Sequence, residues 1–436
     1  MNPDNTIASL AELKSCKGKI IKRIKIADNL TEFPQAIFDY KETLEVLDLS
    51  GNQLCELPSN FSQLAQLKIL FLSNNHFVLF PSVLFACARL TMIGFKENYI
   101  THIPEKSLPI NTRWLILTDN QLTTLPHDIG NLHVLEKCIL AGNALQQLPN
   151  SFKNCRALKL LRISANQLQY LPEAITQLPQ LAWLAVAGNS FTSSVAAVKD
   201  VPTIAMNKVR LGDVLGEGAS GVIYHATVEK SQYAIKLFKG EVTSDGYPAD
   251  ELHACLSISA HPNLVRVIAR VDELGSQGVL MDLIPNRFEN LGQPPSLSSC
   301  TRDTFNDCHR FTQLQVISII RQVADVLAHI HQHHFIHGDI YAHNISVDSQ
   351  GSILLGDMGA ASNIVHLSHD EKNQLLLMEY RAFAYLIDDI LVSCVNFDVN
   401  FLPQDHELLR IHALCQKMIA DSYQQINLIQ SIKRIL

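Results

Sequence analysis

Residues 44–58 read LEVLDLSGNQLCELP, and residues 158–172 repeat the same pattern as LKLLRISANQLQYLP. The shared pattern is L-x-x-L-x-L-x-x-N-x-L-x-x-L-P. Outward from these two copies, asparagines recur every 22 or 23 residues, at Asn52, Asn75, Asn98, Asn120, Asn143, Asn166 and Asn189. An earlier, degenerate copy has Asp28 in the asparagine place, which brings the array to about eight repeats.

So regular a period predicts a stack of small structural units. Each repeat is expected to supply a short strand, such as Val46–Leu49, whose leucines point inward, and one repeat cannot bury its apolar face without neighbours. The asparagine side chain is expected to bind backbone groups at the bend after the strand. Residues 20–191 therefore resemble leucine-rich repeats, which implies an α/β solenoid, and residues 1–19 are expected to form its N-terminal cap.

The strand residues between the core leucines are expected to point outward onto one concave face. One column on that face holds Val46, Ile69, Met92, Trp114, Lys137, Leu160 and Trp183, and includes both tryptophans of the chain. The neighbouring column holds Asp48, Phe71, Gly94, Ile116, Ile139, Arg162 and Ala185. Because an exposed apolar patch usually marks a contact surface, this face is predicted to bind a protein. The partner is a substrate, a regulator or the chain's own second domain, and padding of the core is the alternative.

The repeat pattern fades after Phe191, and residues 192–208 read as a cap or linker. From Val209 the character changes, because short strand-like segments alternate with glycine turns. The expected strands are Val209–Leu215, Gly221–Thr227, Gln232–Phe238 and Val279–Leu283. Residues Thr312–Gln332 carry apolar side chains at helical spacing. Residues 209–436 are thus expected to form one domain, with a strand-rich half followed by a helix-rich half.

The first chemistry-bearing motif of this domain is a glycine-rich turn between two predicted strands. Glycines allow backbone N–H groups to approach phosphate oxygens closely. Its position between strands disfavours a dinucleotide-binding motif, which precedes a helix, and a plain hairpin turn is the alternative. The expected nucleotide-contacting residues are Leu215, Gly216, Glu217, Gly218, Ala219, Ser220, Gly221, Val222 and Ile223.

Three further motifs follow in order. Residues 233–236 read YAIK and place Lys236 on an apolar strand, where binding to phosphates and to a helix carboxylate would explain its charge. Glu251 is the expected carboxylate, with Asp250 as the alternative. Residues 337–344 read HGDIYAHN and place Asn344 five residues after Asp339, and Asp357 begins the sequence DMG thirteen residues later.

These four motifs resemble those of protein kinases, and the whole chain resembles bacterial leucine-rich-repeat protein kinases. The resemblance implies an α+β bilobal domain that uses ATP and Mg²⁺. It implies that Lys236 and Glu251 pair near the phosphates, that Asp339 acts on the substrate hydroxyl, and that Asn344 and Asp357 hold the metal. It also implies a gatekeeper and a hinge against adenine, at Met281 and at Asp282 to Ile284 respectively.

The sequence departs from the kinase pattern at several places. Gly338 replaces an arginine that normally binds an activation-loop phosphate, and Tyr341 replaces a lysine that contacts the transferring phosphate. Glu379 stands where the large helix of the C-terminal lobe normally begins with an aspartate. The activation segment is then expected to span about twenty residues.

Composition narrows the function further. Hydrophobic residues make up 47% of the chain and charged residues 18%, and the net charge is −7, which disfavours nucleic-acid and anionic-membrane partners. No apolar stretch is long enough for a membrane span, and scattered cysteines suit a cytoplasmic protein. The motifs and the resemblance to kinases thus predict a serine/threonine protein kinase with recruiting repeats. A small-molecule phosphotransferase, which also spells this loop His-Gly-Asp, and a non-catalytic scaffold are the alternatives.

Overall fold

A computed structural model describes residues 6–16, 18–192, 202–218, 221–273, 276–305, 310–400, 402–420 and 426–436. The chain divides into two compact units. The first contains Met1–Leu161 and Asn166–Pro179, and the second contains Arg162–Ala165 and Gln180–Leu436. The boundary expected at residue 209 therefore lies inside the second unit, which includes the end of the repeat array.

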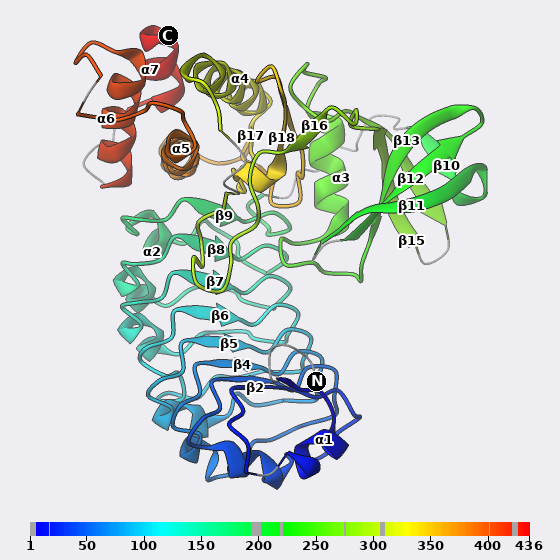
Figure 1. Cartoon of the computed structure of the whole chain (residues 1–436), viewed down its shortest axis with the longest axis vertical. Coiled ribbons are helices and arrows are strands. Elements are labelled where there is room, and N and C mark those ends of the chain that lie inside the picture. The colour runs from blue at the N-terminus through cyan, green and yellow to red at the C-terminus, as the bar shows by residue number, and fades with distance from the viewer. Residues whose placement is uncertain are drawn as a thin grey trace. The chain divides into compact units, whose positions relative to one another are not determined.

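The first unit is built on a parallel sheet whose strands pair in sequence order; β1 precedes the repeats, and each later strand belongs to one repeat (Figure 1). Its strands are β1 (Thr6–Ile7), β2 (Arg23–Lys25), β3 (Val46–Asp48), β4 (Ile69–Phe71), β5 (Met92–Gly94), β6 (Trp114–Ile116) and β7 (Lys137–Ile139). Its helices are α1 (Leu10–Ser15), α2 (Glu173–Thr176) and the 3-10 helices η1 (Gln35–Tyr40), η2 (Phe61–Gln63), η3 (Ser82–Ala86), η4 (His127–Asn131) and η5 (Asn150–Asn154). Strand β8 (Leu160–Arg162) begins in this unit, and its last residue belongs to the second.

The regular spacing of asparagines has the structural cause that the sequence predicts. Asn98 is typical: its Oδ1 accepts from Phe77 N at 3.0 Å, and its Nδ2 donates to Leu72 O at 3.0 Å and Phe95 O at 3.2 Å. Each asparagine thus satisfies backbone groups of two successive repeats. The residue before each one has a positive φ, and these residues are Gly51, Asn74, Glu97, Asp119, Gly142, Ala165 and Gly188.

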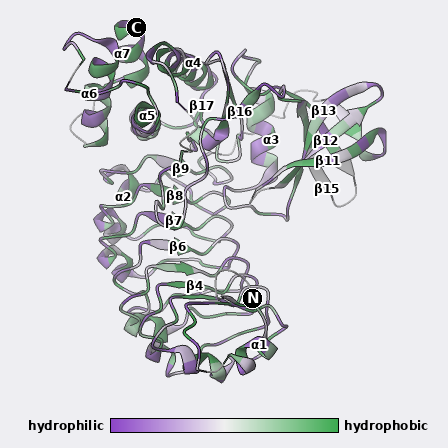
Figure 2. Cartoon of the chain, in the orientation of Figure 1, coloured by the Kyte–Doolittle hydropathy of each residue, from purple (hydrophilic) through white to green (hydrophobic). Residues whose placement is uncertain are grey.

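The leucines of each repeat fill the interior of the first unit. Leu47, Leu70 and Leu115, at the centres of their strands, are fully buried. Hydrophobic and hydrophilic segments alternate along the ribbon of the repeats (Figure 2). The first unit is therefore held together by apolar burial between neighbouring repeats, and its asparagines satisfy the backbone at every bend.

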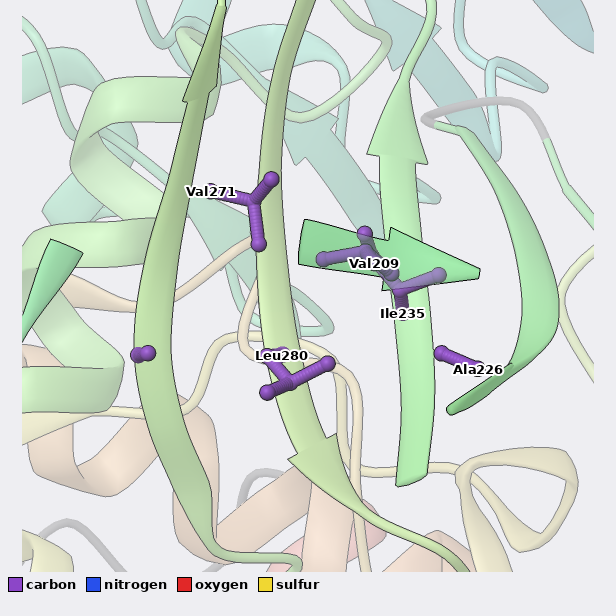
Figure 3. Close-up of a cluster of buried hydrophobic side chains, with 6 residues drawn as sticks. Val209, Ala226, Ile235, Val271 and Leu280 are labelled. Atoms are coloured by element: carbon purple, nitrogen blue, oxygen red, sulfur yellow. The ribbon is translucent and has the colours of Figure 1, made fainter. Parts of the chain in front are cut away.

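The second unit contains a six-stranded sheet in the order β10-β14-β15-β13-β12-β11. Its strands are β10 (Thr203–Ala205), β11 (Val209–Glu217), β12 (Gly221–Val228), β13 (Ser231–Phe238), β14 (Val267–Glu273) and β15 (Ser276–Asp282). The four strands expected from the sequence are among them, to within a few residues at each end. A cluster of buried side chains holds this sheet together, and Figure 3 shows its members Val209, Ala226, Ile235, Val271 and Leu280.

The helical half of the second unit follows the sheet. Its helices are α3 (Pro248–Ser257), α4 (Gln313–Gln332), α5 (His369–Val392), α6 (Glu407–Ile419) and α7 (Leu428–Ile435), with the 3-10 helices η6 (Met206–Lys208) and η7 (Ala342–Asn344). Short strands β16 (Phe288–Asn290), β18 (Ile345–Asp348) and β19 (Ile353–Leu355) form one small sheet, and β17 (Phe335–Ile336) pairs with β20 (Ser362–Asn363). Helix α4 begins as predicted, because Thr312 and Gln315 form a capping box.

The last repeat is part of this second unit. Strand β9 (Trp183–Ala185) lies beside Ile163, since Ile163 N donates to Ala185 O at 3.0 Å. Asn189 closes the repeat by donating to Ile163 O and Val186 O. Within the described residues, no helix combines the length and the apolar character that a membrane crossing requires.

Candidate active site

Strand β13 carries a buried lysine toward helix α3. The Nζ of Lys236 lies 2.7 Å from Glu251 Oε1 and 3.3 Å from Asp357 Oδ1, and only 6% of the lysine is exposed. Glu251 is equally buried, in the first turn of α3. The alternative partner, Asp250, makes neither of these contacts, and its Oδ2 is buried without a hydrogen-bond partner. The structure thus brings Lys236 together with Glu251, the first of the two carboxylates that the sequence offers.

The charges of this group act on one another. Burial alone would lower the pKa of Lys236, but the negative charges of Asp357 and Glu251 outweigh it and raise that pKa. For Asp357, burial works in the opposite direction, and the lysine and a hydrogen bond from Gly359 N hold its pKa below the ordinary value. Burial raises the pKa of Glu251 to about 7, against the pull of Lys236. A lysine that stays charged beside an ionised Asp357 follows from this arrangement.

The loop between β17 and η7 holds Asp339 and Asn344 in contact. The Nδ2 of Asn344 donates to the backbone oxygen of Asp339 and to its Oδ2, both at 2.9 Å. His337, which is fully buried, accepts from Asp339 N through Nδ1, and its Nε2 lies 3.1 Å from Gly356 O. The spacing of five residues seen in the sequence therefore corresponds to a closed loop whose asparagine fixes its aspartate.

A short hairpin brings Asp357 to the same place. Strands β18 and β19 pair from Ile345 with Leu355, and Gly356 N donates to Asn344 O at 3.0 Å, so Asn344 and Asp357 flank the hairpin. Asp357 has a φ of 51°, in the left-handed region that few residues other than glycine, asparagine and aspartate adopt. About half of its side chain, 47%, is exposed. Its carboxylate is therefore available to a ligand while it contacts Lys236.

Glu379 holds the loop of Asp339 in place through backbone hydrogen bonds. Its Oε1 accepts from His337 N at 2.5 Å and from Gly338 N at 2.9 Å, and its Oε2 contacts His331 Nε2. Burial would raise the pKa of Glu379, but the contacts with His331 and with the backbone N–H groups lower it. Glu379 lies in the middle of α5, which begins at His369. The activation segment is therefore shorter than the expected length of about twenty residues, because the helix starts a full ten residues before Glu379.

The glycine-rich turn joins β11 to β12 as a hairpin. Glu217 pairs with Val222 and Gly216 with Ile223 across it, and Gly218 N donates to Gly221 O at 3.0 Å. No atom lies within 4 Å of a Cβ built on Gly216 or Gly218, so the space beside them is open. Leu215 is half exposed. Ala219 and Ser220 lie outside the described residues.

The residues expected as gatekeeper and hinge lie at the end of strand β15 and just after it. Met281 lies opposite Ala234 of β13, and Asp282 ends β15. The carboxylate of Asp282 forms an exposed ion pair with Arg266 at 2.9 Å. Ile284 is half-buried two residues beyond the strand. These three residues therefore lie where β15 leaves the sheet.

The sequence interpretation missed the role of Arg162. Its Nε donates to Asp245 Oδ1 at 2.7 Å and its Nη1 to Gly338 O at 3.2 Å, and its Nη2 contacts Asp339 Oδ1. Only 4% of its side chain is exposed. The one available signal was an arginine in the outward column of the repeats, and nothing in the sequence connects it to Asp339.

Trp183, expected on an outward column, is buried, and the residues that cover it belong to the chain's own second domain, one of the partners expected for that face. Its ring stacks on Tyr341 at 4.6 Å and on Tyr385 at 5.2 Å, and its Nε1 donates to Ile340 O at 2.9 Å. Trp183 therefore contacts the loop of Asp339 in its own chain. Tyr341, at the place of the kinase lysine, is covered by this tryptophan.

The glycine at position 338 is also explained by packing against strand β9. Its φ is +74°, and a Cβ there would lie 2.5 Å from Leu184 O of β9 and 2.7 Å from Ala360 O. Contacts this short with backbone atoms exclude any side chain. The glycine in place of the kinase arginine is thus required by the strand that packs against it.

Two families of known proteins match parts of this chain. The family described as Protein kinase domain matches residues 209–386, and the family described as Leucine rich repeat matches residues 26–77. A solved leucine-rich-repeat protein of Leptospira interrogans is 25% identical over 42% of this chain and 53% of that chain, with a TM-score of 0.37.

Several curated relatives are protein kinases. They include the probable serine/threonine-protein kinase gdt4 of Dictyostelium discoideum, 29% identical over 37% of this chain and 9% of the relative. Two relatives from Arabidopsis thaliana are mitogen-activated protein kinase kinase kinase 2, 27% identical over 36% of this chain and 24% of the relative, and the serine/threonine-protein kinase GRIK1, 26% identical over 37% and 40%. The match spans less than half the length of each relative. The chain thus contains leucine-rich repeats followed by a protein kinase domain, which resembles the domains of serine/threonine kinases.

Proposed function

We propose that the chain is an ATP-dependent protein kinase that phosphorylates serine or threonine side chains, and that its repeats recruit a protein substrate or regulator. The observation that carries the proposal is the contact of buried Lys236 with both Glu251 and Asp357. A buried lysine is costly unless it is paired, and here its partners come from α3 and from the Asp-Met-Gly motif. That pairing is the arrangement that positions phosphates in protein kinases.

The chain's own residues suit Mg-ATP. When bound, Mg-ATP supplies the transferable phosphoryl group and the charge of the cation. Lys236 directs its charge toward the α and β phosphates, and Asn344 and Asp357 offer oxygen atoms, the ligands that Mg²⁺ prefers. Among the described residues, no cluster of three or more histidine, cysteine, aspartate or glutamate side chains is arranged to hold a metal. A site made of Asn344 and Asp357 suits a cation that takes most of its ligands from phosphates and water.

The remaining roles follow the same logic. Asp339, fixed by Asn344, accepts the proton of the substrate hydroxyl, and its lone pairs point the hydroxyl toward the phosphoryl group. The hairpin from Leu215 to Ile223 covers the phosphates with its backbone N–H groups, for which Gly216 and Gly218 leave room. Met281, Asp282 and Ile284 contact adenine.

The setting forms part of the proposal. Parallel strands that pair in sequence order support a solenoid, whose face binds the protein partner. The order of repeats and kinase domain supports kinship with bacterial leucine-rich-repeat protein kinases. The described cysteines are free thiols, which fits a reducing, cytoplasmic location.

The test is phosphoryl transfer by the purified full chain. Incubation with radiolabelled ATP, Mg²⁺ and generic protein substrates should place label on serine or threonine, as phosphoamino-acid analysis would show. Asp339→Asn should reduce transfer by about 10²–10⁴-fold, because a positioned base contributes that much. Asp325→Asn, at an exposed ion pair with Lys433, is the matched control. Absence of transfer by the wild type, with label found on neither substrate nor chain, would refute the proposal.

A further inference from the structure

The loop of Asp339 lacks two cations that its resemblance to kinases implies. Gly338 stands at the arginine position and Tyr341 at the lysine position. Leu184 O fills the space that a side chain at Gly338 would need, and the Trp183 ring stacks on Tyr341, the residue at the lysine position. Leu184 and Trp183 both come from the last repeat. The strand before it supplies a cation to this loop.

Arg162 is that cation. It forms ion pairs with Asp339 in the loop and with Asp245, which precedes α3, and it donates to Gly338 O. Three nitrogen atoms of the guanidinium are thus used by three different acceptors, in the fork geometry that arginine provides and lysine does not. The guanidinium joins the loop of Asp339 to the segment that leads into the helix of Glu251.

The surroundings of Arg162 are closely packed. A Cβ on Gly246 would lie 2.8 Å from the Cβ of Ser164, so the loop that carries Asp245 rests against the segment that carries Arg162. Burial would lower the pKa of Arg162, but Asp339 and Asp245 raise it. Removing one member of a buried ion network leaves uncompensated charge, so Asp339 and Asp245 depend on this arginine.

The contact orients Asp339 without using up its acceptor capacity. Arg162 binds Oδ1, and Asn344 binds Oδ2 at 2.9 Å. An ionised carboxylate offers about four lone-pair sites, so two hydrogen bonds fix its plane and leave sites for a substrate hydroxyl. The side chain of Asp339 is 17% exposed to solvent.

We propose that Arg162 is a positioning residue for Asp339, supplied by the repeat array in place of the cations missing from the loop. The functional kinase module therefore begins within the repeats, at residue 162, and is incomplete without them. This inference rests on the proposed kinase activity. It assigns a role to Arg162, which lies outside 209–386, the range that matches the kinase family.

The test compares steady-state kinetics of full-length variants. Arg162→Ala should lower kcat by about 100-fold, because misplacement of a catalytic group by roughly 1 Å has an effect of that size. The KM for ATP should stay unchanged, since Lys236 and Asp357 keep their contact. Methylguanidine should restore part of the lost turnover. The matched control is Arg113→Ala, at an arginine of the first unit that pairs with Glu136.

Arg162→Lys covers the case in which Arg162→Ala does not fold, because lysine keeps the charge and loses the fork. It should retain the melting-temperature shift with Mg-ATP and have reduced kcat. Unchanged kcat in a folded Arg162 variant would overturn the positioning role, and increased kcat would overturn it in favour of a brake on Asp339. Absence of transfer in the wild type and in every variant would instead refute the kinase proposal, and the positioning role with it.

Discussion

The two units bury different kinds of polar side chain. In the described part of the first unit, the buried polar residues are asparagines, serines and threonines, all of them neutral. The second unit buries Arg162, Lys236, Glu251, Glu379 and Arg381. A neutral amide that bonds to backbone groups specifies a bend and does nothing else. Buried charges are retained at a cost in stability, and all of these except Arg381 belong to the contacts around Asp339 and Asp357, which marks where chemistry is expected.

The largest effect is expected from removing one of the buried charges of the second unit. Lys236→Met should lower phosphoryl transfer by about 10³-fold or more, because charge complementarity to the phosphates is lost in a water-poor site. It should also abolish the rise in melting temperature caused by Mg-ATP. Lys433→Met is the control, since Lys433 forms an exposed ion pair with Asp325, away from the hairpin of Leu215 to Ile223. Near-normal phosphoryl transfer by Lys236→Met would show that Lys236 has no part in binding the phosphates.

The second effect is structural. Glu379→Ala should destabilise the second unit by about 3–5 kcal/mol, because His337 N, Gly338 N and His331 lose a buried acceptor. The two tryptophans make the measurement specific, since Trp114 lies in the first unit and Trp183 in the second. Urea unfolding of a Trp114→Phe background reports the second unit through Trp183.

The control for that change is Glu241→Ala, at an exposed carboxylate of the same unit, which should stay within about 0.5 kcal/mol. If Glu379→Ala costs no more than Glu241→Ala, the buried carboxylate is not the anchor of the loop.

A smaller effect on stability is expected from removing one of the buried neutral side chains of the first unit. Asn120→Ala should destabilise the first unit by about 1–3 kcal/mol, because Ile100 N, Phe95 O and Leu117 O lose their partner. Urea unfolding of a Trp183→Phe background, followed through Trp114, measures it. Asn111→Ala is the control, since Asn111 bonds only to Ala88 O at the surface. A cost for Asn120→Ala equal to that of Glu379→Ala would erase the contrast between the units.

The smallest effect concerns pH. His343 contacts Asp303 at 2.8 Å; burial would lower its pKa, but the hydrogen bond and charge of Asp303 raise it above 6.5. A raised pKa in the folded state means that the pair stabilises fully below the unfolded pKa and that this contribution is lost as pH rises through the folded value. The melting-temperature difference between wild type and His343→Gln should therefore be larger at about pH 5.5 than at about pH 8.5. An equal difference at both values would exclude a titrating pair.

Periodicity and short motifs predicted what depends on local sequence. The 23-residue spacing of asparagines predicted the strands and their bends, and the order of the motifs brought Lys236, Asp339 and Asp357 into one unit. The pairing of Arg162 with Asp339 was missed because 177 residues separate them and neither has a local signature for the other. Trp183 was expected on an outward face because its strand neighbours alternate correctly, but alternation does not reveal what covers a face.

The contact between Gly338 and Leu184 O has an evolutionary consequence. A side chain at position 338 and the carbonyl of β9 compete for the same space, so the two positions cannot change independently. A chain with an arginine at position 338 would need its last repeat to be absent or shifted. Among related chains, a glycine before the loop aspartate should therefore be inherited together with a terminal repeat that carries a tryptophan and an arginine at the positions of Trp183 and Arg162.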